Sequence, residues 1–155
     1  MSGEGKPDLD IDGTGLTVTI VSGLWHTRIS EGLLAGARGV LAASGATVSE
    51  VQVAGSFELP VVAKAALEAG ADAVVALGVI VRGETPHFDF VAAAATDGLT
   101  RVALDTGKPV GFGVLTVDTE QQGLDRAGLP GSKEDKGREA AEAVLATVAV
   151  LRTLR

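Results

Sequence analysis

The segment RGETPH at residues 82–87 combines residue types suited to anion binding and proton transfer. Gly83 permits close approach of a ligand to the backbone, and Thr85-Pro86 resembles a helix N-cap followed by proline at the first helical position. Amide groups at such a helix start attract anions such as phosphate. His87 would then lie beside the anion and could exchange protons near neutral pH. The same residues also fit a capping loop whose histidine only bonds the backbone.

A second group of polar residues, Ser56 and Glu58, precedes Pro60, which is tolerated at the start of a helix. A hydroxyl and a carboxylate in this position commonly cap the helix. They could also donate to and accept from the hydroxyl groups of a polyhydroxylated ligand. Residue types alone leave both interpretations open.

Aromatic and imidazole side chains gather around a few segments of the chain. The only tryptophan (Trp25), both histidines and three of the four phenylalanines lie in or beside residues 23–26, 55–58, 82–87 and 116–119. This clustering favours a planar ligand. The alternative is that Trp25 only covers a sheet edge.

Each of these segments follows a predicted strand. Apolar patterning predicts strands over 16–21, 47–53, 73–81 and 110–116, and residues 73–81 (AVVALGVIV) are apolar on both faces, as a central parallel strand requires. Helical spacing predicts helices over 29–41, 60–70, 91–102 and 119–127 and from about 134, with Ser132 and Asp135 spaced like a capping box. Alternating strands and helices with right-handed crossovers predict a flavodoxin-like α/β fold, a three-layer αβα sandwich with a four-stranded parallel sheet. The four segments then meet at the carboxyl edge of the sheet, where such folds bind ligands.

Length and composition limit the alternatives. The chain has 155 residues, 46% of them hydrophobic, which suits a single domain over 16–155 after a flexible, Gly- and Asp-rich arm over 1–15. A formal charge of −7 argues against nucleic-acid binding. The absence of cysteine excludes disulfides and thiolate metal sites, and two histidines without a cluster argue against a metal. The longest apolar run, 73–81, is too short to cross a membrane, and no signal peptide precedes it, so a cytoplasmic protein is expected.

Four stretches of the chain resemble the lumazine synthase family in their order and spacing. They are GSFELP (55–60), ALGVIVRGETPHFDFV (76–91), GFGVLT (111–116) and LDRAGLPGSKEDKG (124–137). The resemblance covers nearly everything after residue 15. It implies condensation of 5-amino-6-(D-ribitylamino)uracil with 3,4-dihydroxy-2-butanone 4-phosphate to 6,7-dimethyl-8-ribityllumazine, with loss of phosphate and water and without a metal or redox cofactor.

The resemblance also implies roles for residues that bind the ribitylaminouracil. Trp25 would stack on the pyrimidine ring, with Phe57 in the same site. Ser56 and Glu58 would hold the ribityl hydroxyls. Backbone groups of Val79, Ile80 and Val81 would hydrogen-bond to the edge of the pyrimidine ring.

A further set of roles concerns phosphate and proton transfer. Gly83, Glu84 and Thr85 would form the phosphate loop, and His87 would move protons. Arg126 would clamp the phosphate with its planar fork. Phe112 and Lys136 would close the pocket. In the family these last three groups come from the adjacent subunit.

Family members assemble as pentamers, and in some of them the pentamers build icosahedral shells. The insertion GLPGS at residues 128–132 resembles the longer connection of members without shells, which favours a simple homopentamer. A rival hypothesis is a flavodoxin-like module that binds a lumazine or flavin without catalysis. A dinucleotide-binding oxidoreductase is disfavoured, because no G-x-G-x-x-G follows the first strand.

Overall fold

The central layer of the molecule is a parallel sheet whose strands end at one edge. The computed structural model describes residues 4–9 and 11–155. The strands are β1 (Thr17–Gly23), β2 (Thr47–Val53), β3 (Ala73–Val81) and β4 (Val110–Val117), and they form a four-stranded sheet in the order β2-β1-β3-β4. All three pairings are parallel. This order is that of the flavodoxin-like folds, so the predicted fold class is confirmed.

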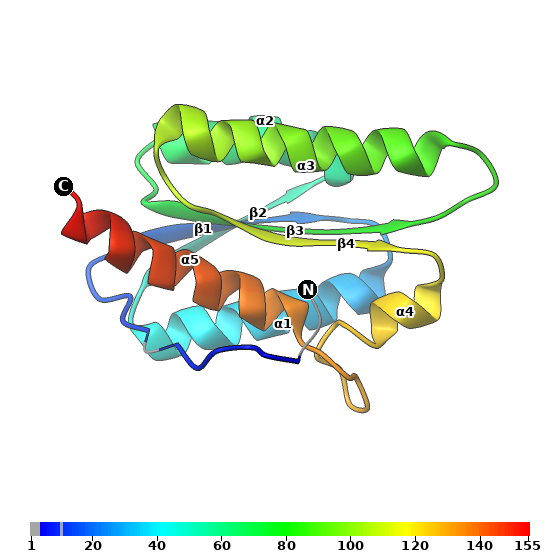
Figure 1. The fold of residues 1–155 in the computed structure, drawn as a ribbon, viewed down its shortest axis with the longest axis horizontal. Coiled ribbons are helices and arrows are strands. Elements are labelled where there is room, and N and C mark those ends of the chain that lie inside the picture. Colours follow the sequence, from blue (N-terminus) through cyan, green and yellow to red (C-terminus); the bar gives the residue numbers. More distant parts are fainter. Residues whose placement is uncertain (1–3, 10) are drawn as a thin grey trace.

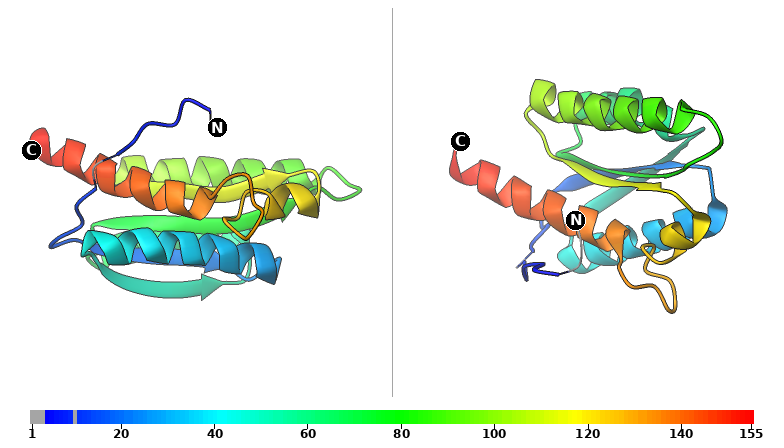
Figure 2. Two further views of the ribbon diagram at one scale, coloured as in Figure 1. Left: turned by 90° about the horizontal axis from the view of Figure 1, so that it is seen from below. Right: turned by 45° about the vertical axis from the view of Figure 1, so that its right-hand side comes forward.

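Helices cover both faces of the sheet, as Figure 1 shows. On one face lie α2 (Leu59–Glu68) and α3 (His87–Thr106). On the other lie α1 (Thr27–Ser44), the short α4 (Glu120–Leu124) and α5 (Lys136–Thr153). In Figure 2, the right-hand view shows helices on both sides of the sheet, and the left-hand view, from below, shows the loop between β3 and α3 extending beyond the sheet.

The predicted elements agree closely with the observed ones, and the differences lie at their ends. The strands over 47–53 and 73–81 are confirmed residue for residue. The helix over 119–127 is shorter than predicted, because the chain forms a bridge between Ala127 and Asp135 after α4 ends. The prediction that Ser132 and Asp135 form a capping box is wrong. Asp135 is itself the N-cap and accepts from the Arg138 N–H, whereas the Ser132 hydroxyl donates to the Leu124 carbonyl inside the connection.

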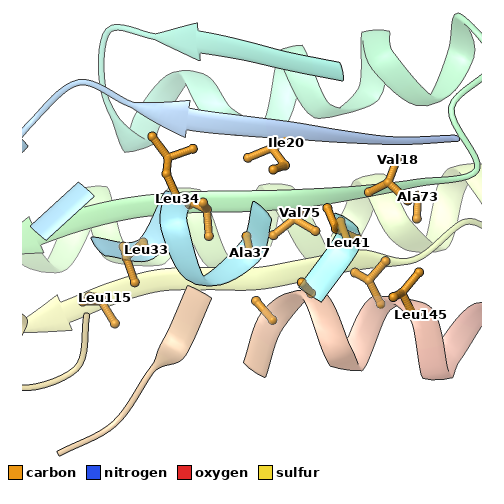
Figure 3. Packing of buried hydrophobic residues seen from close by; sticks show 14 of the residues in the cluster. Val18, Ile20, Leu33, Leu34, Ala37, Leu41, Ala73, Val75, Leu115 and Leu145 are labelled. Atoms are coloured by element: carbon orange, nitrogen blue, oxygen red, sulfur yellow. The ribbon is translucent and has the colours of Figure 1, made fainter. Parts of the chain in front are cut away.

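Two apolar clusters hold the layers together, one on each face of the sheet. The cluster under α1 and α5 is the larger; Figure 3 shows Leu33, Ala37 and Leu41 of α1 packed against the sheet, with Leu145 of α5 beside them. The second cluster joins α2 and α3 to the other face. Strand β3 contributes alternate residues to both clusters, which explains why its sequence is apolar throughout.

The N-terminal residues carry a prediction that the structure leaves open. Residues 1–3 and 10 lie outside the described part of the chain. Within the remainder, the Lys6 ammonium lies 3.5 Å from a carboxylate oxygen of Glu142 on α5. The division into a flexible arm over 1–15 and a single domain over 16–155 stays a prediction.

The contact between α1 and α5 depends on Gly137. A Cβ there would overlap the Leu33 carbonyl oxygen and lie 2.7 Å from the Leu33 carbonyl carbon, and both atoms belong to backbone that cannot turn aside. We therefore expect Gly137→Ala to lower the free energy of unfolding by about 1–3 kcal/mol, as overpacking typically does. The matched control is Gly39→Ala on α1, where a Cβ meets nothing within 4 Å and helix propensity predicts a gain of about 0.5–1 kcal/mol. Equal urea midpoints for the two variants, at equal protein concentration, would contradict this account of the packing.

Candidate active site

A cavity of about 640 Å³ opens at the carboxyl edge of the sheet. It is built from the loop after β1, the 3₁₀ turn η1 (Ser56–Glu58) after β2, the end of β3, and the loop and first turns of α3. The crossover from β2 to β3 passes over β1, so β1 and β3 are neighbours whose following loops diverge. Such a divergence leaves a crevice beyond the strand ends. The lining residues are Trp25, His26, Gly55, Ser56, Phe57, Glu58, Val79, Ile80, Val81, Gly83, Thr85, His87, Phe88, Phe90 and Val91.

Trp25 supplies an aromatic wall to this cavity. Its side chain is 66% exposed, so the ring face is accessible to a ligand. The indole lies against the backbone at Gly55, where a Cβ would come within 3.1 Å of the Trp25 Nε1 and 3.4 Å of a Glu58 carboxylate oxygen. Glycine at this position therefore brings the indole and the carboxylate close to the same backbone segment.

Ser56 forms the buried side of the cavity. It is only 7% exposed, and its hydroxyl occupies the place where a side chain at Gly78 of β3 would be. Phe57, by contrast, is 64% exposed. The turn η1 thus presents a buried hydroxyl, an exposed ring and the Glu58 carboxylate within three consecutive residues.

The loop before α3 has the predicted composition but a different cap. Thr85 is not the N-cap: Pro86 takes that position with ψ of −1° and no side-chain cap bond, so the helix begins at His87. The Thr85 hydroxyl instead accepts from the His87 N–H at 3.4 Å. Gly83, Thr85 and His87 line the cavity, whereas Glu84 does not.

Three of the predicted site residues lie away from this cavity. Phe112 is on the edge strand β4 and is 47% exposed. Arg126 lies just after the end of α4. Its guanidinium donates to the Gln122 carbonyl at 2.8 Å and lies 3.8 Å from a Glu134 carboxylate oxygen. The Lys136 ammonium, at the start of α5, lies 3.4 Å from the same Glu134 oxygen and 3.0 Å from a Glu139 oxygen. One chain therefore presents the predicted site as two separate parts.

Several lining residues carry no role in the sequence-based prediction: His26, Gly55, Phe88, Phe90 and Val91. Sequence signals existed for some of them. His26 adjoins Trp25, and its ring centroid lies 6.4 Å from that of the indole. Phe88 and Phe90 follow His87 directly in the FDF triplet. The backbone of His26 is unusual, because it is the one non-glycine residue with a positive φ (55°) in the described part of the chain.

Comparison with known proteins decides the family. A profile of 6,7-dimethyl-8-ribityllumazine synthase matches residues 15–152. The chain belongs to the 6,7-dimethyl-8-ribityllumazine synthase family. This match spans the whole sheet and every segment that lines the cavity, so the predicted resemblance is confirmed.

Three relatives that carry the name of this synthase show how closely the chain follows the family. The protein from Leifsonia xyli subsp. xyli is 71% identical over 100% of this chain and 99% of its own length. That from Kineococcus radiotolerans is 61% identical over 98% and 95%. That from Streptomyces avermitilis is 54% identical over 99% and 97%. Among solved structures, LsrB from Clostridium saccharobutylicum in complex with AI-2 gives a TM-score of 0.43 at 24% identity over 61% of this chain and 26% of that chain, a likeness too distant to inform the site.

The described helices give one further fact that bears on class. None of them combines the length and apolar character that crossing a bilayer requires.

Proposed function

We propose that this chain catalyses the reaction named by its family, the formation of 6,7-dimethyl-8-ribityllumazine from 5-amino-6-(D-ribitylamino)uracil and 3,4-dihydroxy-2-butanone 4-phosphate. The 5-amino group attacks the ketone, and loss of water leaves an imine. Phosphate is then eliminated. The ribitylamino nitrogen closes the second ring with loss of another water, and no electrons enter or leave. The observation that supports this proposal is the single cavity shared by Trp25, Glu58, Gly83 and His87.

The residues that line the cavity include groups suited to each of the two substrates. The exposed Trp25 ring suits stacking on the pyrimidine, and the exposed Phe57 lines the same cavity. Val79, Ile80 and Val81 also line it and could bind the edge of the ring. The Ser56 hydroxyl and the Glu58 carboxylate provide a donor and an acceptor for the ribityl chain. The loop of Gly83, Glu84 and Thr85 provides amides for the phosphate. Glu84 itself is not among the residues that line the cavity, so its place in the phosphate loop rests on the family resemblance.

Positioning supplies most of the rate in this proposal. Holding two reactants in the correct geometry can be worth about 7–11 kcal/mol. General acid–base catalysis contributes about 10²- to 10⁴-fold, which is the smaller term. His87, in the first turn of α3 at the cavity wall, is the residue placed to move protons between the amine, the imine and the departing phosphate.

The second part of the site comes from a neighbouring subunit. Arg126, Lys136 and Phe112 do not line the cavity of their own chain, yet two are cations suited to a phosphate and one is an exposed aromatic ring. A cyclic assembly in which each chain completes the cavity of the next satisfies both facts. We propose a homopentamer, located in the cytoplasm, whose active sites lie between adjacent subunits. Light scattering that gave the mass of an icosahedral shell would contradict the simple pentamer.

The alternative function is a passive binder that holds a lumazine or flavin. Purified protein is mixed with both substrates, and lumazine fluorescence and released phosphate are followed together. We expect the two products to appear in equal amounts, and neither to appear when the ketose phosphate is omitted. Binding of added lumazine without any product formation would favour the passive binder.

A further inference from the structure

Arg82, the first residue of the RGETPH segment, makes contacts that the proposed chemistry does not use. It stands at the end of β3, and its Nε donates to a carboxylate oxygen of Asp118 at 2.8 Å, just beyond the end of β4. Its Nη1 lies 3.5 Å from a carboxylate oxygen of Asp89 in the first turn of α3. Its Cζ lies 4.3 Å from the centroid of the Phe88 ring. One guanidinium therefore joins the end of β3, the loop after β4 and the first turn of α3.

These contacts hold together the two ends of residues 83–88, here called the anion loop. The chain leaves the sheet at Arg82, whose N–H donates to the Val117 carbonyl at 2.9 Å, and returns to the fold at Asp89. The pair of Arg82 with Asp89 therefore ties together the two ends of residues 83–88. This segment includes the loop proposed to bind phosphate and the His87 proposed to move protons. Its residues 83–87 are all exposed, so packing does little to hold them.

We propose that Arg82 is a positioning residue that fixes the anion loop and His87 through Asp118, Asp89 and Phe88. This inference rests on the proposed function for the meaning of the loop, but not for the geometry of the tie. Arginine suits the task because its planar fork can bond one carboxylate, approach another and lie over a ring at the same time. The hydrogen bond to Asp118, together with the nearby Asp89, raises the pKa of the Arg82 guanidinium and so favours its charged form.

The competing explanation is that the ion pairs of Arg82 are surface interactions without any effect on the site. Exposed ion pairs contribute little to stability, and the Arg82 side chain is 46% exposed. A positioning role differs because its effect appears in the placement of the loop. A misplacement of about 1 Å at reacting groups can cost on the order of 10²-fold in rate.

The test compares Arg82→Met with Arg38→Gln. Arg38 makes an equally exposed two-pronged pair with Glu50, which joins α1 to β2 away from the cavity. For Arg82→Met we expect the KM for the ketose phosphate to rise about 10-fold and kcat to fall by a similar factor, with the KM for the pyrimidine substrate nearly unchanged. Arg82→Lys keeps the charge but not the planar fork, so its kinetic constants are expected to lie between those of the unsubstituted protein and those of Arg82→Met. Arg38→Gln should match the parent protein.

Amide hydrogen exchange gives a readout that does not depend on activity. Peptides spanning residues 82–91 should exchange faster in Arg82→Met and, to a smaller degree, in Asp118→Asn, but not in Arg38→Gln. Asp118→Asn also serves if Arg82→Met fails to fold. Unchanged exchange together with an unchanged KM for the ketose phosphate would overturn the positioning role while leaving the proposed function intact. A parent protein that makes no lumazine would overturn the proposed function, and faster exchange in the variants would still support the tie.

Discussion

Replacing His87 by alanine is expected to slow turnover by about 10- to 10⁴-fold, up to the limit of typical general acid–base contributions. The imidazole stands at the cavity wall in the first turn of α3, beside the loop proposed to bind phosphate. The substrates would still bind, because the stacking wall and the phosphate loop remain. The loss should therefore appear in kcat, with KM changed little. Steady-state measurement of lumazine formation checks this, and added imidazole should restore part of the rate.

The control for His87 is the other cavity histidine. His26 has a left-handed backbone (φ 55°), which alanine would strain, so His26→Asn is the suitable variant, because asparagine tolerates this conformation. We expect His26→Asn to retain most of the turnover. If both substitutions reduced kcat equally, or if His87→Ala left it unchanged, the proton-transfer role assigned to His87 would be wrong.

Arg126→Ala is expected to weaken the ketose phosphate substrate rather than slow the chemistry. A hydrogen bond to a charged group is worth about 1.5–3 kcal/mol, which corresponds to a rise in KM of about 10- to 150-fold. The KM for the pyrimidine substrate should stay near its original value, since the stacking wall belongs to the other part of the site. Initial rates with each substrate varied in turn would show the difference.

Lys133→Ala provides the matched control for Arg126. Lys133 lies in the same connection, is 80% exposed and pairs with Asp125 at 3.7 Å, so it adds a similar positive charge without a proposed role. Its replacement should change neither KM by much. A rise in the KM for the ketose phosphate of the same size in both variants would indicate a general effect of charge rather than a clamp by Arg126.

The fold could be predicted because each element carries its own periodic signal. Strand β3 is apolar on both faces because it is central, and the match of 73–81 is complete. Errors arose where hydrogen bonds between distant segments decide the outcome. Ser132 looked like a helix cap, yet its hydroxyl bonds Leu124, eight residues earlier, because the connection folds back on α4. Local spacing cannot reveal such a return of the chain.

The site was predictable to the extent that topology brings strand ends together. Trp25, Glu58 and His87 come from separate segments, and the carboxyl edge of the sheet places them at one cavity. His26 and Phe90 belong to the aromatic and imidazole cluster that the sequence shows, but the sequence assigns them no specific role, because their contribution depends on how the loops turn. The roles of Arg126 and Lys136 came from family resemblance alone, and within a single chain these cations contact acidic side chains rather than the cavity.

The most direct test of the account is a hybrid assembly. His87→Ala and Arg126→Ala subunits are unfolded together in equal amounts and refolded. The mixture is assayed at a ketose phosphate concentration where each variant alone is nearly inactive. If each site takes its cavity from one subunit and its arginine from the next, about a quarter of the sites combine intact parts and should recover about a quarter of the original activity. Activity no higher than the mean of the two separate variants would contradict an active site shared between neighbouring chains.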